Sequence, residues 1–178
     1  QSIANGPSPT DYSGSLYDKG HMNPNGDQLW DTQVEFESFL MTNMTPQAPS
    51  LNRGAWKLLE TSVRGWTVQL NQSYTVYVVA IYSPTDKKIG SGVVVPHALY
   101  KIVINNVTGE SAGWEFPHVA PYPILGNDLT KFRKTIADIQ KESGIIYKYP
   151  ANVKELAVGK EWIVDFGKLT AAKKAKCK

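Results

Sequence analysis

The stretch Tyr17–Pro24 reads YDKGHMNP and places one histidine between a glycine and a methionine. A charged pair, Asp18 and Lys19, precedes the glycine, and turn-forming residues follow the methionine. This setting predicts that His21 lies on or beside a loop with its imidazole exposed. A lone histidine is usually structural, but an exposed one can take a proton from water near neutral pH. His21 is therefore the first candidate for a catalytic base.

The clearest helical pattern in the N-terminal half of the chain is residues 51–63, for which Ser50 is a suitable N-cap and Gly65 a suitable end. Asn52, Glu60 and Arg64 recur at multiples of four residues, so we expect them on one polar edge. Magnesium prefers oxygen ligands and keeps several waters, so one oxygen from Asn52 could be enough to hold it. The residue type alone favours the alternative, a capping residue at the helix start.

After residue 65 the apolar residues alternate and become β-branched, which predicts strands. The alternation starts at residues 66–70, and the strands expected after it are 74–82, 93–95, 100–105, 114–119 and 145–149. Further helices are expected at 28–41 and 129–143, the second ending at Gly144, with loops at 1–16, 42–50 and 121–128. This order predicts an α+β domain with a largely antiparallel central sheet.

Length and composition are those of a globular protein. The 178 residues suffice for one domain over 1–178 with a sizeable core, and 42% hydrophobic residues exclude a disordered chain. No apolar run reaches the roughly 20 residues of a membrane helix. The net charge of +3 permits a polyanionic partner, although much of the excess lies in a lysine-rich tail at 168–178.

Cys177 is the only cysteine, so it is either a free thiol or a bridge to another chain. The chain begins at Gln1, which suggests a processed form, and we expect a secreted or otherwise exported protein. Three glycosylation sequons begin at Asn43, Asn71 and Asn106, a number that chance could supply.

Other side chains carry weaker signals. Zinc spacings and HExxH are absent. The carboxylates of Asp18, Asp27 and Asp31 could form an acidic site, but charged turn residues are usually just solvated. His97 is expected to be structural, and nothing suggests a function for His118. The five tryptophans are expected in the core: Trp30, Trp56, Trp66, Trp114 and Trp162.

Taken together and in order, residues 18–22, 43–47 and 51–56 with Glu60 resemble the DNA/RNA non-specific endonuclease family. The resemblance extends through residues 77–79, 95–101 and 139–145 and covers about residues 9–150. It implies the ββα-metal nuclease fold, a central mostly antiparallel sheet flanked by helices. The family is often marked by a DRGH sequence, which here reads DKGH.

The resemblance also implies roles for the site residues. His21 would be the general base, and Asn52 the sole direct protein ligand of Mg²⁺, for which Mn²⁺ could substitute. Glu60 would hold the metal through water, and Arg64 would contact the substrate phosphate. Asp18 and Lys19 would lie at the substrate as members of the motif.

Two departures from the family pattern stand out. Lys19 replaces the usual arginine, so the charge remains but the bidentate fork is lost. Family members usually carry several dozen residues before the histidine motif, including strands and a phosphate-contacting arginine, whereas twenty residues precede His21 here. The N-terminal part of the usual fold is therefore expected to be missing from this chain, whether cleaved off, supplied as another chain or lost. We favour cleavage with retention as a second chain, for which Cys177 offers a bridge.

The resulting hypothesis is a magnesium-dependent endonuclease that hydrolyses phosphodiester bonds of DNA and RNA without sequence preference. It would leave a 5′-phosphate and a 3′-hydroxyl, and its binding would depend on salt because lysine and arginine contact the backbone. The alternative is a catalytically impaired nuclease scaffold that binds nucleic acid or a protein partner without cleavage. A toxin-type effector nuclease would use the same chemistry.

Overall fold

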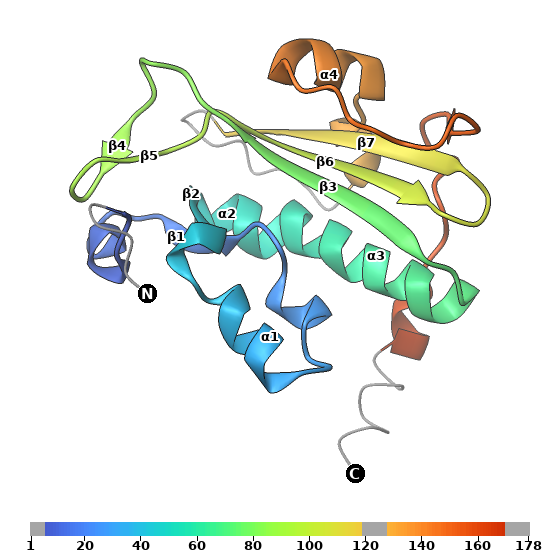
Figure 1. The fold of residues 1–178 in the computed structure, drawn as a ribbon, viewed down its shortest axis with the longest axis horizontal. Helices are drawn as coiled ribbons and strands as arrows, with labels where there is room; N and C mark the ends of the chain where they lie inside the picture. Colours follow the sequence, from blue (N-terminus) through green and yellow to red (C-terminus); the bar gives the residue numbers. More distant parts are fainter. Residues whose placement is uncertain (1–5, 119–127, 170–178) are drawn as a thin grey trace.

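A four-stranded sheet in the order β3-β6-β7-β8 forms the centre of the computed structural model, which describes residues 6–118 and 128–169 (Figure 1). The first three strands pair antiparallel, and β8 joins β7 parallel. The strand bounds are β3 Tyr74–Ile81, β6 Ala98–Asn105, β7 Glu110–Pro117 and β8 Lys154–Glu155. The α+β class and the mostly antiparallel sheet are confirmed.

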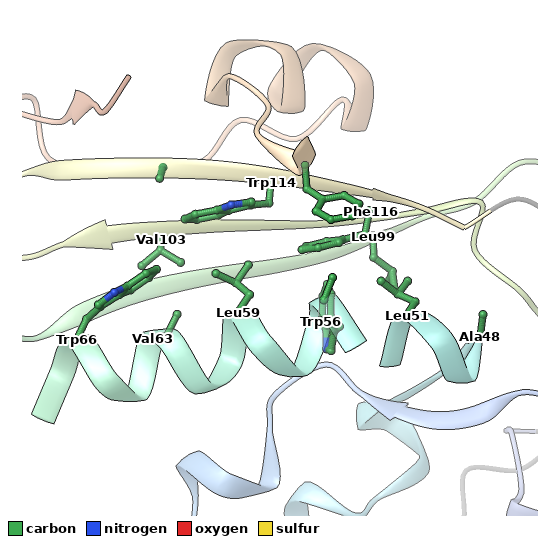
Figure 2. Packing of buried hydrophobic residues seen from close by; sticks show 13 residues of the cluster. Ala48, Leu51, Trp56, Leu59, Val63, Trp66, Leu99, Val103, Trp114 and Phe116 are labelled. Carbon is green, nitrogen blue, oxygen red and sulfur yellow. The ribbon is translucent and has the colours of Figure 1, made fainter. Parts of the chain in front are cut away.

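Helices cover both faces of this sheet, α3 (Lys57–Leu70) on one and α4 (Ile136–Ser143) on the other (Figure 1). The side chains of β6 alternate between them: Leu99 and Val103 pack toward α3, whereas Ile102 and Ile104 pack toward α4. Figure 2 shows the larger cluster, in which aromatic and aliphatic side chains of the helix meet those of the sheet: Trp56, Leu59, Val63, Trp66, Leu99, Val103, Trp114 and Phe116. This burial fixes α3 against the sheet.

The helix that leads into this core is longer than predicted and is interrupted. It begins with α2 (Pro49–Leu51), passes through a π-helical turn η4 (Asn52–Trp56) and continues as α3 to Leu70. Ser50 is therefore inside it, since Ala48 is the N-cap. Gly65 does not end it either. The glycine is instead needed for packing, because a Cβ at this position would lie 2.7 Å from the side chain of Val164. Residues 66–70 are consequently helical, and Asn71 closes the helix at φ 50°.

The N-terminal region contributes a separate two-stranded sheet. β1 (Asp18–His21) pairs antiparallel with β2 (Met44–Gln47), so His21 lies on a strand and residues 42–50 are not a loop. The connection between them contains η2 (Asn25–Asp27), α1 (Thr32–Ser38) and η3 (Met41–Asn43), and α1 is shorter than the expected helix 28–41. The expected loop 1–16 contains a short helix, η1 (Pro9–Tyr12). A small hairpin of β4 (Lys88–Ile89) and β5 (Val93–Val94) precedes β6.

Four further predictions were wrong, wholly or in part. Residues 129–143 form two helices, η5 (Leu129–Phe132) and α4, although Gly144 closes α4 as expected. Residues 145–149 form no strand, and β7 begins at Glu110, earlier than expected. Trp30 is 74% exposed instead of buried, whereas Trp56, Trp66 and Trp114 are in the core. The expected loop at 121–128, apart from Asp128, and Cys177 lie outside the described residues.

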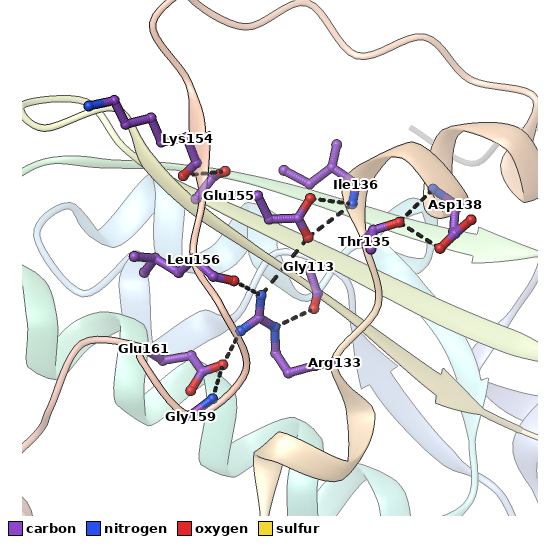
Figure 3. A network of polar contacts seen from close by, with 11 residues as sticks. Gly113, Arg133, Thr135, Ile136, Asp138, Lys154, Glu155, Leu156, Gly159 and Glu161 are labelled. Carbon is purple, nitrogen blue, oxygen red and sulfur yellow. Dashed lines mark hydrogen bonds and ion pairs between the residues drawn. The ribbon is translucent and has the colours of Figure 1, made fainter.

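The segment after α4 is tied to the sheet by a buried arginine (Figure 3). The guanidinium of Arg133 donates to the carbonyl oxygens of Gly113 at 3.0 Å and Leu156 at 2.8 Å, and it forms an ion pair with Glu161. It also lies 5.3 Å from the ring centroid of Trp114. Within the described ranges, no helix is long and apolar enough to span a membrane.

Candidate active site

The imidazole of His21 lies at the end of β1, and one of its nitrogens has no hydrogen-bond partner among the described residues. Its ring meets that of Phe39 edge-on, with centroids 5.2 Å apart. Nε2 is buried and has no hydrogen-bond partner in the described part of the chain. Burial lowers the pKa of His21, so the ring is neutral at neutral pH. The prediction of an exposed histidine on a loop was therefore wrong. His21 is half-buried and neutral, and its unpartnered ring nitrogen suits a general base.

Asp18, three residues earlier on β1, joins this strand to the start of the long helix. Its carboxylate accepts from Asn52 Nδ2 at 2.9 Å and from both Arg53 Nε, at 2.8 Å, and Arg53 Nη2, at 2.7 Å. Partial burial acts to raise the pKa of Asp18, but these hydrogen bonds outweigh it and the pKa lies below its usual value. Asp18 thus stays ionised and orients Asn52.

The orientation of Asn52 follows from its contact with Asp18. An ionised carboxylate only accepts hydrogen bonds, so the amide nitrogen must face Asp18 and the amide oxygen must point away. That oxygen is a neutral ligand of the kind that magnesium accepts, and a magnesium ion that keeps its waters needs few protein ligands. Groups of three or more histidine, cysteine or acidic side chains that could hold a metal do not occur among residues 6–118 and 128–169. The donor set therefore fits a hard cation held by one amide oxygen and does not fit zinc.

Glu60 and Arg64 lie further along the helix, beyond the π-helical turn that separates them from Asn52. This turn breaks the regular four-residue row, so the three side chains do not share one uniform edge. Arg64 Nη1 donates to Asp27 at 2.7 Å, and the Glu60 carboxylate lies 3.7 Å from Lys101 Nζ. Burial raises the pKa of Glu60, and the neighbouring cations Lys101 and Arg64 offset only part of this effect. Asp27 is thus the partner of Arg64 and not part of an acidic metal site.

A pocket of about 410 Å³ opens between these side chains and β3. Its lining combines polar side chains with side chains of β3: Asn23, Asp27, Gln28, Asn43, Glu60 and Lys101 with Tyr74, Val76 and Val78. Met22, which follows His21, also lines it. The pocket therefore brings Glu60 together with Asp27, the partner of Arg64, and with Met22, whereas His21 and Asn52 do not line it.

A sequence profile of the DNA/RNA non-specific endonuclease family matches residues 2–156. The chain belongs to this family. A nuclease from Nostoc sp. is 31% identical over an alignment of 154 positions that covers 82% of this chain and 54% of that protein. Human mitochondrial endonuclease G is 27% identical over 154 residues, 77% of this chain and 50% of that protein.

Family membership agrees with the fold. A chain in the crystal structure of the EndoG/EndoGI complex matches 87% of this chain and 69% of its own length, with a TM-score of 0.72 and 24% identity. The ββα-metal nuclease fold is thereby confirmed. The chain spans about half the length of the curated relatives that it matches.

Within this family member, the other two histidines have structural surroundings. His118 is buried: its Nε2 accepts from the Ala48 amide at 2.6 Å, and its Nδ1 lies 2.7 Å from the Pro96 carbonyl oxygen. His97 Nδ1 lies 3.0 Å from the carboxylate of Asp86. Lys19 is exposed on β1 and takes part in no ion pair within the part that the structure describes.

Sequence reasoning missed Lys101 and Arg53. Lys101 is 1% exposed, and burial lowers its pKa to about 8, with Glu60 acting in the opposite direction. Its signal in the sequence was a single charge within the otherwise uncharged strand ALYKIVIN. Arg53 had no such signal, since an arginine at a helix start is usually only solvated.

Gly20 of the DKGH sequence also has a local explanation. A Cβ at this position would lie 2.2 Å from Cδ of Gln47, whose side chain is fully buried beneath β1. Only glycine lets the two strands pair with Gln47 in this place, and this pairing sets the position of His21.

Proposed function

We propose that this protein is a magnesium-dependent endonuclease that hydrolyses phosphodiester bonds of DNA and RNA. One observation carries the proposal. His21 Nε2 is buried without a hydrogen-bond partner in the described chain, and the amide nitrogen of Asn52 donates to Asp18, which turns the amide oxygen of Asn52 away from that carboxylate. A free base nitrogen and a free neutral oxygen ligand are what a one-metal phosphodiesterase requires.

In this proposal His21 takes a proton from a water molecule as its oxygen forms a bond to phosphorus. The bond from phosphorus to the 3′-oxygen breaks, and that oxygen takes a proton from solvent, which leaves a 3′-hydroxyl and a 5′-phosphate. Magnesium, when bound, supplies positive charge next to the phosphate oxygens. Asn52 would hold the ion directly, and Glu60 would accept hydrogen bonds from its waters.

The cationic side chains serve the substrate. Arg64 donates to Asp27 in this structure and adds positive charge beside the pocket. Lys19 is exposed at the strand that carries His21, where a backbone phosphate could reach it. Neither contact distinguishes bases, so recognition would follow the phosphate backbone of both DNA and RNA.

The test is cleavage of plasmid DNA and of a structured RNA with magnesium, with and without a chelator. We expect both substrates to be cut only without chelator, and His21→Ala to lower the rate by roughly 10²–10⁴-fold, the usual contribution of a general base. His97→Ala is the matched control and should remain active. An undiminished rate in His21→Ala contradicts the mechanism, and wild-type protein that binds both substrates without cutting supports the impaired scaffold instead.

A further inference from the structure

Lys101 is a buried charge on a central strand of the sheet. β6 lies between β3 and β7, and Lys101 is the single charged residue in it. Its side chain is 2% exposed, and the neighbouring side chains on the same face, Leu99 and Val103, belong to the core that packs against α3. An ammonium group in such surroundings loses most of its hydration, which costs free energy unless polar partners replace the water.

Two partners surround the ammonium group. Nζ lies 3.9 Å from the centroid of the Trp56 ring and 3.7 Å from Glu60 Oε1. Trp56 is itself 1% exposed and stands at the end of the π-helical turn, four residues before Glu60. The ammonium therefore interacts with the face of the indole and with the carboxylate at once.

Stability alone does not explain this arrangement. Replacing a buried ion pair with apolar groups of similar size is often neutral or stabilising. The sheet position could hold a methionine among Leu99, Val103 and Trp56. Burying Lys101 costs free energy of desolvation, and a role in the pocket accounts for that cost better, since Lys101 and Glu60 both line the pocket.

We propose that Lys101 is a positioning residue that holds the Glu60 carboxylate in the pocket wall, facing the waters of an ion held by Asn52. This inference rests on the proposed function. Lys101 would set the geometry of the outer coordination sphere of the proposed magnesium ion. Lys101 itself touches neither substrate nor metal. Removal of such outer partners typically lowers metal affinity or activity by roughly 10–100-fold.

The experiment compares Lys101→Met, Glu60→Gln and the double variant. Mn²⁺ binding to the protein without substrate is followed by electron paramagnetic resonance, and cleavage is measured against Mg²⁺ concentration. We expect Lys101→Met to lower the melting temperature, because Glu60 loses its buried partner. Measured below that temperature, the folded variant should bind Mn²⁺ roughly 10–100-fold more weakly and should need a similarly higher Mg²⁺ concentration for half-maximal cleavage. Because Lys101 acts through Glu60, the double variant should be no weaker than Glu60→Gln.

Lys57→Met is the matched control, since it removes an exposed charge from the first turn of α3 and should bind Mn²⁺ like the wild type. If Lys101→Met does not fold, Lys101→Gln takes its place with the same expected loss. Wild-type Mn²⁺ binding in the Lys101 variant, or losses that add in the double variant, would overturn the inference and leave the proposed function intact. A wild-type protein that neither binds Mn²⁺ nor cleaves overturns both.

Discussion

Three histidines in this chain differ in what their ring nitrogens contact. Those of His118 face a backbone amide and a backbone carbonyl, and Nδ1 of His97 faces Asp86. His21 keeps a buried Nε2 without a partner in the described residues. A buried polar atom without a partner costs free energy, so it marks a place where water or a substrate belongs. At the scale of single residues this atom distinguishes His21 from the other two histidines.

The lowered pKa of His21 predicts the acidic side of the pH–rate profile. The base works only when it is unprotonated, and burial moves its pKa below the ordinary 6.5. The rate kcat/KM should therefore rise with pH, with a midpoint below 6.5, and be level at neutral pH. The measurement is kcat/KM from pH 4.5 to 8 at saturating magnesium, with His97→Ala as a control that keeps the midpoint. A midpoint above 6.5 contradicts this assignment.

At the scale of elements, the decisive contact is between β1 and the π-helical turn η4. Asp18 binds Asn52 and Arg53 there, so one carboxylate connects the strand that carries His21, the proposed base, to Asn52, the proposed metal ligand. The regular four-residue spacing of an α-helix is interrupted in this turn, where Gly54 has non-helical backbone angles. The broken row instead lets Asn52 face Asp18 while Glu60 faces Lys101.

Asp18→Ala tests this contact. Without the carboxylate the Asn52 amide is free to rotate, so we expect metal binding to weaken by roughly 10–100-fold, as for other partners that orient a ligand. Mn²⁺ titration followed by electron paramagnetic resonance measures the effect. Arg53→Ala leaves the Asp18–Asn52 hydrogen bond in place and should have a smaller effect. Equal binding by Asp18→Ala and the wild type would show that Asn52 needs no orienting partner.

At the scale of the whole molecule, the segment after α4 closes the fold through Arg133 (Figure 3). Its guanidinium is 4% exposed and connects Gly113 of β7 with Leu156 and Glu161, more than forty residues further along the chain. Trp162 then packs on Trp66 of α3, with ring centroids 4.9 Å apart. The end of the described chain thus contacts both the sheet, through Arg133, and the helix α3, through Trp162.

Arg133→Met should destabilise the protein while leaving the site unchanged. Removing one partner of a buried ion pair leaves the other uncompensated, so we expect the free energy of unfolding to fall by roughly 3 kcal/mol. Urea denaturation measures this change, and Mn²⁺ binding by the folded variant should equal that of the wild type. Arg53→Met, at a side chain that is 71% exposed, should cost less than about 1 kcal/mol. A stability of Arg133→Met equal to the wild type would refute the closing role of Arg133.

The sequence by itself determined the features that rest on local patterns. The apolar strands around residues 74–82 and 100–105, the helix after residue 51 and the ordered motifs around His21 and Asn52 were enough for the family and the fold class. Only the tertiary structure decided that the helix continues past Gly65, where the missing side chain makes room for Val164. It also decided that His21 lies on a strand, because β1 forms only by pairing with β2. It alone placed Lys101 beside Glu60. Such contacts join residues far apart in the chain, and no periodicity within a short window encodes them.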